Sequence, residues 1–448
     1  MSTGGYWNEA LETLPWPQVL AWQATQLDAF VGPLRRRSAL YARLHAAVPD
    51  PAAIRSIGDL QRLPFTTKDD IRAAQDAATD AMPLGANQGV PIADVVQVLS
   101  SSGTTGSPLY YGLSAADVER IVDAVANTFF TAGIRRTDVV AHLVGLPMVA
   151  GGLPYADAFR RIGATLCWLG GFPTERILRE MRRLRASAVL ATTSFAQHLA
   201  ERGDDPLFDG VPPSALRKVV CGGEPGLNQP EIRRRIVEGL GIDHLRETMG
   251  LGDVIPSIWG ECEAQQGMHF NAQQYVAVEL IDPASGEAVD WREGARGELV
   301  YTALVRDATP LVRYRSRDHA LVTGVDRCAC GRTSPRVRCI GRTDDMLIYK
   351  GMNVFPTAIR DLVVQAFAGR CEPVLRIWKD RADQVRFESP LPLEVEAAAM
   401  VDAADYPSLA QQIEAKVRSE LQVRVAVRVL APGSIERGVY KTPLVRVR

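Results

Sequence analysis

Short apolar runs alternate with amphipathic stretches through the middle of the chain. Beyond residue 90, the segments VVQVLSS, DVVAHLVG, ATLCWLGG, SAVLATT and RKVVCGG have the pattern of short strands. Helical spacing of apolar residues follows them, as in AADVERIVDAVANTFFTAG and QPEIRRRIVEGLG. Strands and helices that alternate in this way are typical of parallel sheets covered by helices. The pattern therefore predicts an α/β fold.

The two ends of the chain follow other patterns. The first ninety residues predict helices, one of which has a capped start where Thr66, Thr67 and Lys68 precede DDIRAAQDAA. From about Val276 the sequence YVAVELIDPASGEAVDWREGARGELVYTAL predicts hairpins with Gly and Asp turns. The last part of the chain holds the strand candidates VLRIWK, QVRFES and VRVAVRVL and the helix candidates TAIRDLVVQAF and PSLAQQIEAKVRSEL.

These patterns predict two domains, because 448 residues exceed what one hydrophobic core usually serves. A large N-terminal domain at residues 1–341 would contain helix-covered, mostly parallel sheets and a β-rich subdomain at about 275–341. A small C-terminal α+β domain would span residues 342–448.

Composition limits the class of protein. A hydrophobic fraction of 46%, a charged fraction of 23% and a formal net charge of -1 are those of a globular protein and do not indicate a nucleic-acid partner. There is no run of about 18 apolar residues and no basic leader ahead of an apolar stretch, so we expect a cytoplasmic protein without a membrane anchor. Seven cysteines form an odd set, which favours reduced thiols or a metal site over a disulfide framework.

The strongest local signal is the segment SSSGTTGSP at residues 100–108, between a strand candidate and a stretch that leads to a helix. Glycines let successive backbone N–H groups point at one anion, and the hydroxyls add donors to phosphate oxygens. A flexible Ser/Gly linker is the plainer alternative, although linkers seldom place Thr-Thr between two glycines. The Lys-Ser/Thr pair of a Walker motif is missing. The segment therefore predicts a loop that holds polyphosphate.

Several segments in order along the chain resemble one family. They are PFTTKDDIR, the phosphate loop, VAGGLPYADAFRRIGAT, CGGEP, GRTSPRV, GRTDDMLIYKGMNVFP and GSIERGVYKTPLVRVR. The chain is similar to the adenylate-forming superfamily of acyl-CoA synthetases, luciferases and peptide-synthetase adenylation domains, and most of all to its phenylacetate-CoA ligase branch. The resemblance implies that Mg²⁺ and ATP activate a carboxylic acid as an acyl-adenylate, that coenzyme A receives the acyl group, and that the small C-terminal domain is mobile.

The resemblance assigns nucleotide contacts to four segments. The loop over the β- and γ-phosphates would be Ser101, Ser102, Gly103, Thr104, Thr105 and Gly106. The segment along the adenine would be Gly222, Gly223, Glu224 and Pro225. Met249 and Gly250 belong to the motif that ends at Asp253, which inherits the magnesium-binding role. Here the chain departs from the family, because Asp253 replaces a longer Glu and Gly252 replaces a hydroxyl-bearing residue.

Further roles are implied nearer the C-terminus. The Asp318 carboxylate can accept both ribose hydroxyls, and Arg342 would reach the ribose and phosphate. Asp344 corresponds to the hinge of the small domain, and Gly351 to the glycine beside the pantetheine tunnel. Lys441 would contact the attacking carboxylate and the α-phosphate, where a cation offsets the charge that builds during attack. Lys441, Arg342 and Asp253 are thus the expected catalytic residues.

Cys262, His269, Cys328 and Cys330 make a full tetrahedral set for zinc. Four protein ligands leave no open position, so such a zinc would be structural. The alternative is four unlinked side chains in the core. Cys339 is a substitute ligand.

The acid-binding pocket is expected near Leu146, Met148, Val149, Gly222 and Met249. This apolar lining favours an aryl or arylacetic acid over an amino acid. An acyl carrier protein or an amine remains an alternative acceptor, and a catalytically silent nucleotide-binding protein of the same fold is a further alternative. The resemblance also implies a homodimer.

Overall fold

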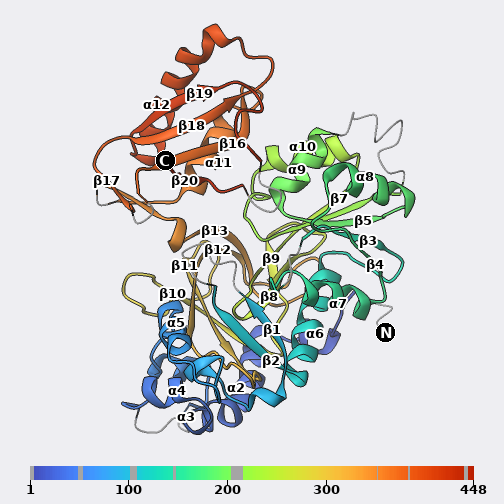
Figure 1. The fold of residues 1–448 in the computed structure, drawn as a ribbon, viewed down its shortest axis with the longest axis vertical. Helices are drawn as coiled ribbons and strands as arrows, with labels where there is room; N and C mark the ends of the chain where they lie inside the picture. Colours follow the sequence, from blue (N-terminus) through green and yellow to red (C-terminus); the bar gives the residue numbers. More distant parts are fainter. Residues whose placement is uncertain are drawn as a thin grey trace.

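The computed structural model describes residues 5–48, 54–100, 108–144, 148–202, 215–350, 352–381, 384–437 and 442–448 (Figure 1). The helices are α1 Glu9–Glu12, α2 Trp16–Val31, α3 Leu34–Arg37, α4 Ala39–Leu44, α5 Lys68–Asp76, α6 Ala115–Thr131, α7 Leu153–Ile162, α8 Thr174–Arg183, α9 Thr193–Glu201, α10 Pro230–Leu240, α11 Pro356–Ala366 and α12 Tyr406–Leu421. The strands are β1 Val95–Ser100, β2 Tyr110–Ser114, β3 Val139–His142, β4 Thr165–Trp168, β5 Ala188–Ala191, β6 Lys218–Gly222, β7 His244–Leu251, β8 Ile255–Glu261, β9 Met268–Phe270, β10 Val276–Ile281, β11 Arg296–Ala303, β12 Tyr314–Gly324, β13 Arg336–Arg342, β14 Leu347–Tyr349, β15 Met352–Val354, β16 Cys371–Lys379, β17 Arg386–Phe387, β18 Leu391–Ala397, β19 Val425–Leu430 and β20 Val445–Val447.

One large sheet organises the first three quarters of the chain. Within the described residues its strand order is β10-β11-β12-β13-β9-β8-β7-β6-β5-β3-β4. Strands β4, β3, β5, β6 and β7 pair in parallel, as the alternation of strands and helices predicts. Every pair from β7 to β10 is antiparallel. Only residues 252–254 join β7 to β8, too few for the crossover that a parallel pair needs. The α/β class is confirmed, and the β-rich stretch continues the same sheet.

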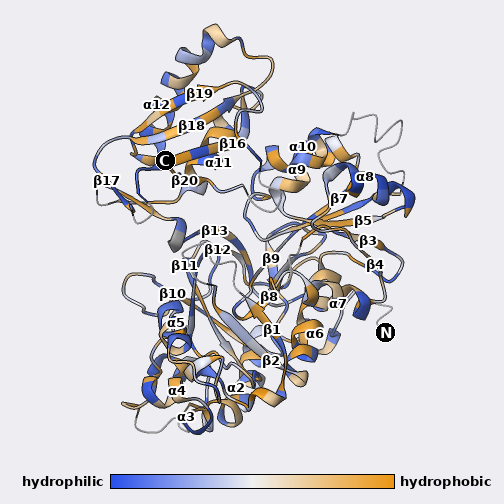
Figure 2. Ribbon diagram, viewed as in Figure 1, coloured by the Kyte–Doolittle hydropathy of each residue, from blue (hydrophilic) through white to orange (hydrophobic). Residues whose placement is uncertain are grey.

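Helices cover both faces of the parallel strands, because successive side chains of a strand point to opposite faces. In β5, Val189 packs in the cluster that includes residues of α8, α9 and α10, whereas Leu190 packs in the cluster that includes α6 and α7. Strands buried in this way are mostly apolar, and β3 and β5 are largely orange in Figure 2. The helices therefore cover the two faces of the sheet, and its parallel strands end together at one edge.

The segment predicted to hold phosphate joins two antiparallel strands. β1 pairs with β2 in a separate two-stranded sheet, with Ser100 opposite Tyr110. VVQVLSS is thus a strand, as predicted, but it lies outside the large sheet. The predicted capped start is confirmed and lies at Thr67, whose side chain accepts the N–H of Asp70 while the Asp70 carboxylate accepts the N–H of Thr67.

The C-terminal part of the chain has its own sheets and core, drawn in orange and red in Figure 1. A four-stranded sheet has the order β19-β18-β16-β20, and a three-stranded sheet has the order β15-β14-β17. Helices α11 and α12 contribute Ile359 and Ile413 to a core shared with Leu375 and Leu393. β13 ends at Arg342, the residue at which the sequence predicts the second domain to begin.

Among the described residues, the helices are too short or too polar to span a bilayer.

Candidate active site

The carboxyl ends of the parallel strands meet at one edge of the sheet, where ligands bind in open α/β folds. β6 ends there at Gly222, the first residue of the segment expected along the adenine. A Cβ at Gly222 would lie 2.8 Å from the Thr248 Oγ1, and Gly223 has a φ of 85°. Both positions therefore require glycine, the first for space and the second for its backbone conformation.

Two elements from different parts of the chain hold the rest of this segment. The Glu224 Oε1 accepts the backbone N–H of Ser194 at 2.5 Å, and the Thr193 hydroxyl donates to the Glu224 carbonyl at 3.3 Å. The Pro225 carbonyl accepts from the Nη1 of Arg360, a residue of α11, at 3.0 Å. The segment is thus fixed on one side by the start of α9 and on the other by the C-terminal part of the chain.

The end of β7 and the turn after it carry the second segment predicted to contact the nucleotide. A Cβ at Gly250 would lie 2.3 Å from the Pro256 carbonyl, so Met249 is followed by a residue that must be glycine. A Cβ at Gly252 would lie 2.9 Å from the Ala150 Cβ. The close packing of Ala150 thus explains why the hydroxyl-bearing residue of the family pattern has no counterpart at Gly252.

Asp253 is almost fully buried, with 4% of its surface exposed. The Tyr314 hydroxyl donates to its Oδ2 at 3.0 Å, and Arg306 donates to the carbonyl oxygens of Asp253 and Val254 at 2.5 and 2.9 Å. Burial and the nearby Asp253 charge raise the pKa of Tyr314 well above its usual value, so Tyr314 stays protonated. Among the described residues, the Asp253 Oδ1 has no hydrogen-bond partner. A buried carboxylate oxygen left in this way fits a cation ligand.

Asp318 and Arg342 are brought together by the pairing of β12 with β13, which places them directly opposite each other. The Arg342 Nη1 donates to the Asp318 Oδ1 at 2.5 Å, and its Nη2 donates to the Ser316 carbonyl at 3.3 Å. The preceding residue, Arg317, has a φ of 62°, in the left-handed region, next to an irregularity in the strand pairing. The two residues predicted to bind the ribose are therefore in contact, 24 positions apart in sequence.

Met148 and Val149, predicted to line the acid pocket, lie beside the start of the phosphate loop. The Ser100 backbone N–H donates to the Met148 carbonyl at 2.7 Å, and Ser100 forms a bridge with Val149. Met148 is 49% exposed and has a φ of 66°, which is uncommon for a residue with a side chain. An exposed apolar side chain at this edge suits an apolar ligand.

Several predicted residues lie outside the described part of the chain. They are Ser101, Ser102, Gly103, Thr104, Thr105, Gly106, Leu146, Gly351 and Lys441. The backbone of Asp344, the predicted hinge, lies in a 3₁₀ turn at Thr343–Asp345, directly after β13.

The four predicted zinc ligands form one group. The ligand atoms of Cys262, His269, Cys328 and Cys330 all lie within 4.8 Å of one another. The Cys330 Sγ is 3.4 Å from the His269 Nε2, and the Sγ atoms of Cys262 and Cys328 are 3.8 Å apart. This thiol contact lowers the pKa of Cys328 and raises that of Cys262. Cys339 lies outside the group, with its Sγ 3.8 Å from the Gly341 carbonyl. The residues fit a tetrahedral zinc site.

The loop that carries two of these cysteines also holds the N-terminal segment. Arg332 pairs with Glu12 at 2.7 Å, with 3% and 1% of the two side chains exposed. The Tyr6 hydroxyl donates to the Cys330 carbonyl at 3.0 Å, and a Cβ at Gly331 would collide with that hydroxyl. Residues 5–14 are therefore attached to the cysteine loop.

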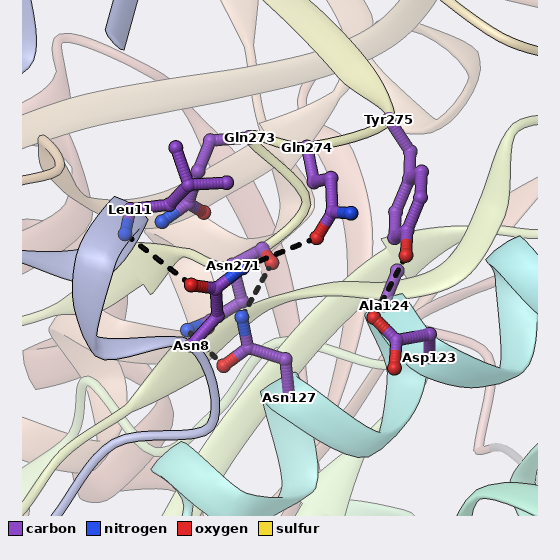
Figure 3. Close-up of a pocket in the computed structure, with 9 residues that line it drawn as sticks. All are labelled: Asn8, Leu11, Asp123, Ala124, Asn127, Asn271, Gln273, Gln274 and Tyr275. Carbon is purple, nitrogen blue, oxygen red and sulfur yellow. Dashed lines mark hydrogen bonds between the residues drawn. The ribbon is translucent and has the colours of Figure 1, made fainter.

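A pocket beside the same segment is not the candidate active site. Figure 3 shows it between α1, α6 and the residues that precede β10. Its volume of about 10 Å³ has room for about one water molecule. The Tyr275 hydroxyl donates to the Asp123 Oδ2 there at 2.8 Å.

Sequence reasoning assigned no role to Tyr314, Arg306 or Arg360, although all three contact predicted site residues. Tyr314 and Asp318 lie four positions apart in one strand, and alternation of buried residues along YRSRD was a signal for Tyr314. The other two act through backbone carbonyl oxygens, for which the sequence carries no signal.

Comparisons with known proteins identify the family. The family model of the AMP-binding enzymes matches residues 25–303, and that of the AMP-binding enzyme C-terminal domain matches residues 351–447. The phenylacetate-coenzyme A ligase of Thermus thermophilus is 33% identical over 443 residues, which cover 95% of this chain and 96% of that protein. The enzyme of the same name from Escherichia coli strain K12 is 30% identical over 371 residues, 80% of this chain and 78% of that protein.

Solved structures agree over the full length. A 2-hydroxyisobutyryl-CoA ligase in the postadenylation state, in complex with 2-HIB-AMP, is 27% identical and has a TM-score of 0.87, with 100% of this chain and 93% of that chain covered. The same enzyme in the thioesterification state, with 2-HIB-AMP and CoA, has a TM-score of 0.71 at 28% identity, with the same coverage.

The chain therefore belongs to the AMP-binding enzyme family, within the adenylate-forming superfamily. Within that family it falls in the phenylacetate-CoA ligase-like branch and is an AMP-forming acid–CoA ligase. Like other members of this branch, it uses ATP and CoA as substrates.

Proposed function

We propose that the acid activated by this ligase is a small aromatic acid, of the aryl or arylacetic class. The observation that carries the proposal is the similarity to phenylacetate-CoA ligases over 95% of the chain. The exposed Met148 beside the phosphate loop supports an apolar acid. The 2-hydroxyisobutyryl-CoA ligase, similar in fold at 27% identity, favours an aliphatic hydroxy acid as the second candidate.

The reaction has two steps. A carboxylate oxygen of the acid attacks the α-phosphorus of ATP, the bond to pyrophosphate breaks, and acyl-AMP remains. The CoA sulfur then attacks the acyl carbonyl carbon and loses its proton, and AMP leaves as the C–O bond breaks. No covalent bond to the protein is needed, so the protein acts by positioning the reactants and offsetting charge.

Different residues of the site contact different parts of the nucleotide. Gly222, Gly223, Glu224 and Pro225 hold the adenine. Asp318 accepts the ribose hydroxyls and Arg342 contacts the ribose and phosphate. Asp253 presents its unpartnered Oδ1 to magnesium, which when bound offsets the charge of the phosphate oxygens. Ser101–Gly106 cover the β- and γ-phosphates, and Lys441 contacts the α-phosphate.

Thioester formation follows a rotation of residues 342–448 about Asp344, which withdraws Lys441 and brings Gly351 to the acyl-adenylate. The TM-scores of 0.87 and 0.71 against two states of one enzyme support this, because identity is almost equal in both comparisons. Lys441→Ala should therefore reduce pyrophosphate release strongly but affect thioester formation from supplied acyl-AMP much less. Equal losses in both half-reactions would contradict the rotation.

Cys262, His269, Cys328 and Cys330 hold a structural zinc. When bound, it would tie the turn after β8 to the loop before β13, and through Arg332 and Glu12 to the N-terminal segment. The four ligands leave it no catalytic position.

The test of the proposed substrate is pyrophosphate release across a panel of aryl, arylacetic, aliphatic and hydroxy acids, followed by thioester formation with CoA. Arylacetic and aryl acids should give the highest kcat/KM. A preference for 2-hydroxy aliphatic acids would overturn the aromatic assignment. Carrier protein or an amine in place of CoA tests the alternative acceptors.

A further inference from the structure

Asp253 is shorter by one methylene than the glutamate that the family places at its position, yet one of its oxygens is held firmly. The Tyr314 hydroxyl donates to Oδ2 at 3.0 Å, and Tyr314 is itself 1% exposed. A buried tyrosine ring has few rotamers open to it, because its neighbours are close-packed. This hydrogen bond therefore fixes the rotation of the Asp253 carboxylate.

The backbone behind the carboxylate is also held. Arg306 is fully enclosed and donates from one nitrogen to the carbonyl oxygens of Asp253 and Val254, at 2.5 and 2.9 Å. Its other terminal nitrogen contacts the Thr309 hydroxyl at 3.2 Å. Main chain and side chain of Asp253 are thus fixed by two separate donors.

Two other buried polar atoms lie near this arrangement. Among the residues that the structure describes, the Asp253 Oδ1 has no hydrogen-bond partner. The Tyr111 hydroxyl lies near Asp253 and Tyr314 but is not in hydrogen-bonding geometry with either. The Tyr111 ring lies 5.6 Å from the Arg306 guanidinium. Buried polar atoms are nearly always satisfied, so a ligand or its water is expected at this position.

We propose that Tyr314 is a positioning residue for the metal of the nucleotide: it holds the Asp253 Oδ2 so that Oδ1 faces the magnesium ion of Mg·ATP. The proposal rests on the magnesium role of Asp253 put forward above. Partners that orient a metal ligand from behind typically change metal affinity by about 10- to 100-fold when removed.

Mn²⁺ and a non-hydrolysable ATP analogue test the proposal without turnover. Binding of Mn²⁺ to the enzyme–analogue complex is followed by electron paramagnetic resonance. Tyr314→Phe removes the hydroxyl and keeps the ring, and should weaken Mn²⁺ binding about tenfold. Affinity for the analogue measured in chelator, without metal, should stay unchanged. A loss confined to the metal-dependent measurement is not expected from a merely structural hydroxyl.

Tyr275→Phe is the matched control, because the Tyr275 hydroxyl also donates to an aspartate, Asp123, at 2.8 Å, in the pocket of Figure 3. It should leave Mn²⁺ binding unchanged. Asp253→Asn separates the magnesium role of Asp253 from the positioning role of Tyr314. If it leaves Mn²⁺ affinity unchanged, the magnesium role of Asp253 fails. If it weakens binding but Tyr314→Phe does not, the role of Tyr314 is overturned.

A second measurement does not depend on the folding of any variant. In a crystal of the unaltered enzyme with Mn²⁺ and the analogue, the metal should lie on Oδ1 while the Tyr314 hydroxyl stays on Oδ2. Metal bound through Oδ2, or a hydroxyl turned away from Asp253, would also overturn the proposal.

Discussion

The replacement Asp318→Asn tests the proposed ribose contact most directly, because it removes a charge and almost no volume. Asp318 is 3% exposed, and its Oδ1 accepts from Arg342 at 2.5 Å. The carboxylate is therefore held in one orientation before the nucleotide arrives. The neutral amide should occupy the same place but accept hydrogen bonds more weakly.

The expected loss follows from the strength of those hydrogen bonds. A hydrogen bond to a charged group contributes about 1.5–3 kcal/mol and a neutral one about 0.5–1.5 kcal/mol. The replacement should therefore cost about 1 kcal/mol for each ribose hydroxyl, or about 2 kcal/mol for both. Since about 1.4 kcal/mol is a factor of ten, kcat/KM for ATP should fall by roughly 30-fold.

Pyrophosphate release with ATP and with 2′-deoxy-ATP isolates the contact. The weakened partner of Arg342 affects both nucleotides alike, whereas only ATP loses a bond to the 2′-hydroxyl. The preference of the enzyme for ATP should therefore fall about fivefold in Asp318→Asn, the factor for about 1 kcal/mol.

Asp138→Asn provides the control, because Asp138 is a buried carboxylate paired with Lys218 at 2.8 Å just before the amino end of β3. Its preference for ATP over 2′-deoxy-ATP should equal that of the unaltered enzyme. An unchanged preference in Asp318→Asn would refute the ribose assignment, however large the loss of activity.

Three further outcomes follow from the structure. Elemental analysis should find about one zinc per chain. Cys328→Ser or a strong chelator should remove the zinc and expose residues 5–14 to limited proteolysis. A metal-free enzyme whose residues 5–14 stay protected would contradict the site. Glu12→Ala leaves Arg332 buried without its carboxylate and should cost about 3–5 kcal/mol, seen as a lower unfolding temperature, whereas an unchanged temperature would argue against the buried pair. Burial, with the nearby Glu261 charge, raises the pKa of Glu247 from 4.5 to about 7. Because the folded state holds this proton more tightly than the unfolded state, stability should fall as pH rises from about 4.5 through about 7. Glu247→Gln should flatten that fall in thermal unfolding curves.

Periodicity was enough to predict the strands and helices between β3 and α10, because the strands there are mostly apolar and the helices are amphipathic. It missed β18, Leu391–Ala397, whose sequence LPLEVEA places Pro and Glu among its apolar residues. That strand lies between β16 and β19, and its alternate residues Leu391, Leu393 and Val395 supply the core. The alternation of apolar and polar residues was therefore a strand signal, obscured by Pro392, a residue type that is depleted in strands.

The pattern of strands and helices did not predict at which strand the parallel pairing ends. The switch from parallel to antiparallel pairing between β7 and β8 follows from the short connection at residues 252–254, of which only Gly252 and Asp253 were interpreted, as part of a nucleotide motif. The motif, residues 249–253, overlaps this reversal of the chain at Gly252 and Asp253.

The candidate site was predictable where motifs carry it and hidden where contacts are long-range. Asp318 and Arg342 were each assigned to the ribose side by resemblance, and their contact depends on strand register, which a sequence does not state. The departure at Gly252 gains a physical reason only from the position of Ala150.

The bond between Arg360 and the Pro225 carbonyl has a consequence for how the enzyme keeps its two half-reactions in order. Asn228 and Asp361 add a second link between the same two elements, at 3.1 Å. The segment proposed to lie along the base of the nucleotide is thus also where α11 is anchored to the large sheet. A rotation of α11 would have to break this anchor, so movement of the C-terminal part of the chain would act directly on the residues proposed to hold the base, with no relay through the core.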